Sequence, residues 1–116
     1  MKLYCYPKWS TCKKAVNWLE ANDIKFEYID ITLTPPSATE LESLFKQNDY
    51  PIKKFFNTSG VKYRELGVKD LLPNLSEPEI FDLLSSDGKL IKRPFLVKNQ
   101  TVLIGFKENL YQQLKA

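Results

Sequence analysis

The sequence predicts an α/β fold in which a four-stranded mixed sheet is flanked by helices. Two groups of elements predict it. The chain opens with a strand, an amphipathic helix and a second strand, a β-α-β unit whose strands should be parallel. It closes with two strands joined by a short turn and with a final helix. The segment between them, from about residue 37 to 87, carries helical patterns, so we expect one domain of 116 residues with a helical insertion.

The β-α-β unit comes first. Residues 2–6 form a short aromatic strand, and the strictly alternating residues 25–31 form its partner. Between them, apolar residues recur at helical spacing as far as about residue 21, and Ser10 or Thr11 can cap the start of this helix. Its apolar face consists of Cys12, Ala15, Val16 and Leu19.

The insertion and the last quarter of the chain complete the prediction. Two Ser-x-x-Glu sequences predict capping boxes, which begin helices after Ser37 and Ser76. Between these helices we expect short helical or irregular pieces over residues 52–56, 63–66 and 68–72. The closing elements are strands over residues 91–97 and 101–106, a turn centred on Asn99-Gln100 and a helix over residues 107–114.

Composition narrows the class of protein. The net charge of +3 is small, and Lys and Glu are scattered, which predicts no nucleic-acid partner and no membrane partner. No apolar run approaches the roughly 18 residues that a membrane span needs. The chain begins directly with a strand and shows no features of a signal peptide, so we expect a cytoplasmic protein.

The chain contains no histidine and only two cysteines. A metal site is therefore not expected, and neither is a Cys-His pair for nucleophilic catalysis. In a cytoplasmic protein two cysteines do not form a disulfide framework. Any cysteine chemistry must be activated by backbone dipoles or by Lys and Arg.

Cys12 has two interpretations. It falls in the first turn of a helix beside Lys13 and Lys14, where a thiolate is stabilised. It also begins the apolar face of that helix, which predicts a small buried side chain, and this interpretation is the one that the pattern favours. Cys5 ends the first strand and is expected inside the sheet, where a disulfide with Cys12 depends on their geometry.

Five separated fragments carry a family resemblance; they cover residues 6–15, 53–60, 63–66, 83–94 and 104–108. The first reads Tyr-Pro-Lys-x-x-Thr-Cys-Lys-Lys-Ala, and the fourth ends in Ile-Lys-Arg-Pro. In this order they resemble the arsenate-reductase-like family, which includes ArsC enzymes and Spx regulators. The resemblance spans essentially the whole chain and implies a thioredoxin-like fold with a helical insertion.

The resemblance also implies a set of site residues. Pro94 matches the cis-proline beside the active loop of the family, and Arg93 matches an arginine that ArsC enzymes use on the oxyanion and that belongs to the redox-sensitive region of Spx. The other interpretation of Arg93 is a surface arginine in a salt bridge. Asn57 and Gly105 stand where two further oxyanion-binding arginines are expected.

Trp9 occupies the position of the nucleophilic cysteine of ArsC enzymes and of the first cysteine in the Cys-x-x-Cys of Spx. Because an indole cannot act as a nucleophile, arsenate reduction by the family's mechanism is not expected, and neither is an Spx-type disulfide. The indole could stack on a peptide or a thiol ligand together with the loop residues Ser10 and Thr11. It could instead fold over the site as a lid, or stand in a variant of a sequence that has Cys here.

These observations leave several functions open. One is a thiol-dependent oxidoreductase with no bound cofactor, which uses Cys12 and Arg93 with glutathione or another low-molecular-weight thiol, or with a protein disulfide. Another is a non-enzymatic regulator that binds a protein such as RNA polymerase, by analogy with Spx. A third is a reductase that has lost its chemistry.

Overall fold

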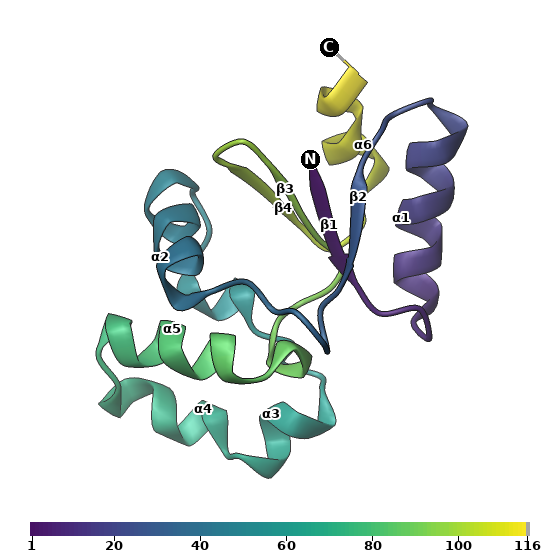
Figure 1. Ribbon diagram of the computed structural model, residues 1–116. Helices are drawn as coiled ribbons and strands as arrows, with labels where there is room; N and C mark the ends of the chain where they lie inside the picture. The colour runs from purple at the N-terminus through teal and green to yellow at the C-terminus, as the bar shows by residue number, and fades with distance from the viewer. Residues whose placement is uncertain (116) are drawn as a thin grey trace.

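The computed structural model describes residues 1–115, and it contains the predicted α/β fold (Figure 1). Four strands form one sheet in the order β2-β1-β3-β4. Their bounds are β1 Lys2–Cys5, β2 Glu27–Asp30, β3 Phe95–Lys98 and β4 Thr101–Ile104. Strands β1 and β2 are parallel, whereas β3 is antiparallel to both of its neighbours. The sheet is therefore mixed, as the sequence predicts.

Helices cover both faces of the sheet. One face carries α1 (Ser10–Ala21) and α6 (Glu108–Tyr111), which continues as a 3₁₀ turn over Gln112–Lys115. The other face is covered by the insertion, seen at the lower left of Figure 1. Its helices are α2 Ala38–Gln47, α3 Val61–Glu65, α4 Val68–Leu71 and α5 Glu77–Ser86. Its 3₁₀ turns are Ile52–Phe55, Leu72–Asn74 and Gly88–Leu90.

The alternation of side chains along β1 divides the core in two. Leu3 and Cys5 pack with α1 and α6, while Tyr4 packs with the insertion. Because successive side chains of a strand point to opposite faces, the three buried residues Leu3, Tyr4 and Cys5 supply both cores. Within residues 1–115, no helix is long and apolar enough to cross a bilayer.

Some predicted boundaries were wrong. The strand expected over residues 91–97 begins only at Phe95, and Ile91 forms an isolated bridge with Phe56. Pro94 has no N–H to donate to a sheet, so the ladder can start only after it. The second strand is shorter than residues 25–31, and the short helical piece expected over residues 52–56 is a 3₁₀ turn over Ile52–Phe55.

The two capping boxes differ. At the start of α5 the box is complete, since Ser76 accepts from the backbone N–H of Glu79 and the Glu79 carboxylate accepts from the backbone N–H of Ser76. At the start of α2 it is only half formed. Ser37 accepts from the backbone N–H of Glu40, but the Glu40 carboxylate accepts from the hydroxyl of Tyr4 instead. That carboxylate thus ties α2 to the sheet.

Replacing Ser76 with alanine should lower the free energy of unfolding by about 1 kcal/mol, because the hydroxyl that accepts from the backbone N–H of Glu79 is lost. Urea unfolding followed by circular dichroism measures the change. Ser43→Ala, at an exposed position within α2, is the control and should leave stability unchanged or slightly raised. Equal effects of the two substitutions would contradict the prediction.

Asn48 joins the insertion to the β3–β4 hairpin. Its side-chain amide donates to the carbonyls of Leu44 and Gln100, each at 2.8 Å, and its Oδ1 accepts from the backbone N–H of Val102. Strand β4 lies at the edge of the sheet. The outward N–H of Val102 therefore has a partner from α2.

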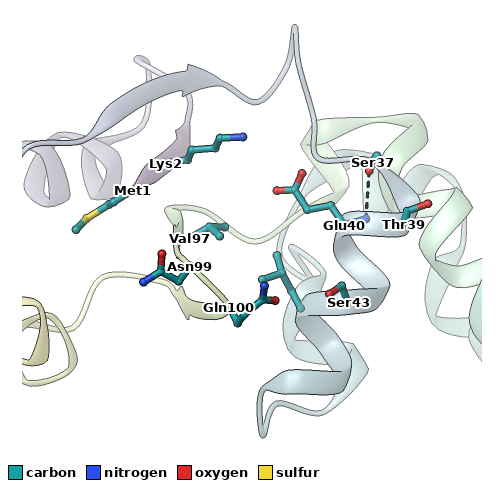
Figure 2. A pocket seen from close by; sticks show the side chains of 10 residues that line it. Met1, Lys2, Ser37, Thr39, Glu40, Ser43, Val97, Asn99 and Gln100 are labelled. Carbon is teal, nitrogen blue, oxygen red and sulfur yellow. Dashed lines mark hydrogen bonds between the residues drawn. The ribbon is translucent and has the colours of Figure 1, made fainter.

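A polar groove of about 470 Å³ lies between the tip of the β3–β4 hairpin and α2. Figure 2 shows its lining, with the hydrogen bond from the Glu40 backbone to Ser37 drawn as a dashed line. None of the predicted site residues lines this groove, so it is not the predicted site.

Candidate functional site

The end of β1, which leads into α1, lies beside the start of β3 at one end of the sheet (Figure 1). A groove of about 610 Å³ lies there, which we name the first groove. Most of the predicted residues border it: Trp9, Ser10, Thr11, Cys12, Asn57 and Arg93. Residues from the first loop, the insertion and the segment before β3 are thus brought together by the fold.

Pro94 lies beside the first groove rather than in its lining. The Arg93–Pro94 peptide bond is cis, and the carbonyl of Pro94 accepts a hydrogen bond from the backbone N–H of Gly105 at 2.9 Å. Gly105 itself has a positive φ of 78°, a conformation that favours glycine over the arginine expected at this position.

The side chains of Trp9 and Arg93 form a stacked pair. The Arg93 guanidinium stacks directly over the indole of Trp9, and that indole also packs edge-on against Tyr6 at 4.7 Å between ring centroids. A cation over an indole face is stabilised by the quadrupole of the ring. The indole is half-buried and packs against Arg93 and Tyr6 at the edge of the first groove.

Arg93 is half-buried and has no carboxylate partner within residues 1–115. Its Nη1 donates to the backbone carbonyls of Gly88 and Lys89, at 3.4 and 3.2 Å. Burial lowers the pKa of Arg93 to about 10, and the nearby carboxylate of Asp87 partly offsets this effect. The guanidinium therefore stays positively charged at neutral pH, and it is held in place by neutral groups.

Cys12 is bonded to Cys5 in a disulfide, with the two Cα atoms 5.8 Å apart. The sequence left this pairing open, and in this structure the geometry of the two residues allows the bond. Both residues are almost fully buried, with 0% of Cys5 and 1% of Cys12 exposed. The apolar interpretation of Cys12 describes its packing, because it lies in the core between α1 and the sheet. Chemistry by a Cys12 thiolate would require prior reduction.

The start of α1 departs from the prediction that Ser10 or Thr11 caps it. The N-cap residue is Trp9, and no side chain accepts from the first N–H groups of the helix. The first turn also contains no acidic residue. Cys12 therefore lies near backbone donors that have no side-chain acceptor, and its Sγ already accepts from the N–H of Tyr6 at 3.4 Å.

A second groove, of about 680 Å³, adjoins the first one and shares Thr11, Lys92 and Arg93 with it. Its basic residues are Lys53, Lys54, Lys92, Arg93 and Lys107. Apolar side chains, among them Phe56 and Phe106, line the rest. Neither groove is lined by an aspartate or a glutamate.

The sequence missed several residues of the site. Tyr6, Lys89 and Lys92 also border the first groove. All three lie inside two of the five fragments that carry the family resemblance, residues 6–15 and 83–94, and this was the available signal. The pairing of Cys5 had no such signal, because it depends on how α1 lies against β1. In residues 1–115, no group of three or more Cys, Asp or Glu side chains is arranged to hold a metal ion.

Comparisons with known proteins agree with this architecture. The model of the ArsC family matches residues 4–114. The protein YusI of Bacillus subtilis is 46% identical over 113 residues, which cover 97% of this chain and 96% of YusI. A solved structure of an ArsC-family-related protein from Bacteroides fragilis has a TM-score of 0.92 and 42% identity, and covers 98% of this chain and 96% of its own. The global transcriptional regulator Spx of Lactiplantibacillus plantarum is 25% identical over 107 residues, or 92% of this chain and 80% of that regulator.

Proposed function

Because this chain belongs to the ArsC family, we propose that it is a thiol–disulfide redox protein in which Cys12 is the reacting sulfur and Cys5 is its resolving partner. The observation that carries the proposal is the Cys5–Cys12 disulfide beside the first groove. Trp9 fills the position where the family's nucleophile is expected. The thiols of Cys5 and Cys12 are therefore the groups left for redox chemistry in this chain.

The environment of Cys12 supports its role as the reacting sulfur. Cys12 borders the first groove, whereas Cys5 does not. When reduced, the Cys12 thiolate would be stabilised by the unpaired N–H groups of α1, by the N–H of Tyr6 and by the neighbouring lysines Lys13 and Lys14. A stabilised thiolate is the species that attacks disulfides.

The proposed reaction is a thiol–disulfide exchange in two steps. The Cys12 thiolate of the reduced protein attacks one sulfur of an external disulfide, whose S–S bond breaks. One thiolate leaves and takes a proton from water. Cys5 then loses its proton to water and attacks Cys12 Sγ, which breaks the mixed disulfide; the second external thiolate leaves and takes up a proton from water. The protein is oxidised by two electrons to the disulfide form, and the external disulfide is reduced to two thiols.

Glutathione disulfide is a suitable first reagent, because its carboxylates match the positive charge of Arg93. Reduced wild-type protein should release two thiols per chain and form the Cys5–Cys12 disulfide. Cys5→Ser should stop at a mixed disulfide on Cys12 and release one. Cys12→Ser should react at least about tenfold more slowly, since Cys5 does not border the first groove and lies outside the first turn of α1. Quenched-flow alkylation followed by mass spectrometry measures each species.

Thermal unfolding of all three reduced proteins serves as the control for folding. Equal reactivity of the Cys5→Ser and Cys12→Ser variants would overturn the assignment of roles. The whole proposal would fail if the folded wild-type protein reacted no faster than the same protein in urea.

A second candidate function is protein binding of the kind suggested by the likeness to Spx. The observation that favours it is the second groove, which combines apolar side chains with lysines and lies beside Pro51 and Tyr50. RNA polymerase is the partner that this likeness suggests. Binding of this type would not need sulfur, so its persistence in a Cys12→Ser variant distinguishes it from the redox function.

A further inference from the structure

We infer that the thiol exchanging with Cys12 carries several phosphate groups, which bind in the second groove while its sulfur enters the first. This inference rests on the proposed redox function and names the class of thiol that it uses. It is carried by the continuity of the two grooves and by the distribution of charge along them.

The two grooves form one path. Thr11, Lys92 and Arg93 line both of them, so a ligand that reaches Cys12 in the first groove passes these residues on its way to the second. The second groove also has Lys53 and Lys54, from the 3₁₀ turn Ile52–Phe55, and Lys107, the N-cap residue of α6, in its lining. The sulfur of a long thiol would therefore lie beside Cys12 in the first groove. The far end of the same thiol would lie among the cations of the second groove.

No aspartate or glutamate lines the second groove. Within residues 1–115, ion pairs join Lys62 to Asp87 and Lys46 to Glu42, and neither pair includes a residue of this groove. Arg93 adds a half-buried charge that is held by carbonyls and by an indole rather than by a carboxylate. Burying part of a charge without a partner is unfavourable, and an anionic ligand would remove that penalty.

The number of cations distinguishes between thiols. Glutathione carries carboxylates that an ammonium group partly offsets, and Arg93 with Lys92 would match them. Lys53, Lys54 and Lys107 would then remain unmatched. A phosphate-bearing thiol such as coenzyme A places several full negative charges at the end far from its sulfur, and its less polar portion could lie against the half-buried Phe106 and Leu110. The groove therefore fits the polyphosphate thiol better.

The test compares three disulfides at low salt: coenzyme A disulfide, glutathione disulfide and the neutral hydroxyethyl disulfide. Reduced wild-type protein should be oxidised about tenfold faster by coenzyme A disulfide than by glutathione disulfide, because a cleft of one sign of charge concentrates an oppositely charged reagent. The advantage should shrink as sodium chloride is added. A variant with Lys53→Gln, Lys54→Gln and Lys107→Gln should lose it and should keep its rate with hydroxyethyl disulfide.

The matched control is Lys25→Gln with Lys69→Gln and Lys46→Gln, which removes the same charge from positions outside both grooves. Its preference for coenzyme A disulfide should persist. Inorganic pyrophosphate should inhibit oxidation by coenzyme A disulfide more strongly than sodium chloride of equal ionic strength, and it should not inhibit oxidation by hydroxyethyl disulfide.

Two failures are distinguishable. Equal rates with coenzyme A disulfide and glutathione disulfide, or loss of the preference in the control variant, would overturn the inference and leave the redox function standing. Failure of Cys12 to react with any of the three reagents faster than in urea would overturn the redox function itself.

Discussion

Replacing Gly88 with alanine is expected to lower the free energy of unfolding by about 3 kcal/mol, at the upper end of what overpacking usually does. A Cβ atom built on Gly88 would lie 1.8 Å from the backbone carbonyl oxygen of Ile31. Backbone atoms cannot rotate aside as a long side chain can, so the chain after β2 and the 3₁₀ turn Gly88–Leu90 must move apart. Ile31 and Leu90 are both fully buried, and their packing would be disturbed.

The same displacement should reach the site. The carbonyls of Gly88 and Lys89 accept the hydrogen bonds of Arg93. Urea unfolding measures the stability, and tryptophan fluorescence of the folded variant reports on the indole of Trp9 beneath Arg93. Gly67→Ala is the control. Gly67 has a positive φ of 62° but nothing within 4 Å of its Cβ position, so only about 1 kcal/mol is expected there. Similar losses for both variants would refute the steric explanation.

Reduction of the Cys5–Cys12 disulfide should lower the free energy of unfolding by about 2.5 kcal/mol. Closing a loop of this size, with a sequence separation of 7, removes that much conformational freedom from the unfolded chain. Urea unfolding with and without dithiothreitol gives the difference. Because the bond also anchors the first turn of α1 to the end of β1, amide hydrogen exchange should increase in that turn more than in α5.

The double variant Cys5→Ala with Cys12→Ala provides the control, since dithiothreitol should have no effect on it. Equal stability of the oxidised and reduced wild-type protein would contradict the prediction. It would show that the disulfide does not stabilise the fold by restricting the unfolded chain. A fall in stability of the double variant on adding dithiothreitol would show that the reagent acts by another route.

Much of the fold could be predicted because the signals are local. Alternation and helical spacing gave the β-α-β unit, and Ser76 with Glu79 gave the start of α5. Errors arose where a distant group competed with a local one. The carboxylate of Glu40 accepts a hydrogen bond from the hydroxyl of Tyr4, 36 residues away in sequence, instead of completing the predicted capping box. No local pattern contains that information.

The site was predicted mainly through the family resemblance and less through patterns. The resemblance identified Trp9, Asn57 and Arg93, which do border one groove. It did not indicate that the guanidinium stacks on the indole, because the two residues lie far apart in sequence and no pattern links them. The disulfide was also beyond prediction, since the angle between α1 and β1 decides whether Cys12 faces Cys5.

The hydrogen bond from Val102 to Asn48 has a consequence for association between copies of the chain. An edge strand offers its outward N–H and C=O groups to any extended segment that approaches, and such pairing is a route to aggregation. On β4 one of these donors is already occupied by a side chain from α2. A strand from another molecule could not pair along the whole of β4 without first displacing Asn48. The insertion therefore also hinders intermolecular strand pairing at this edge.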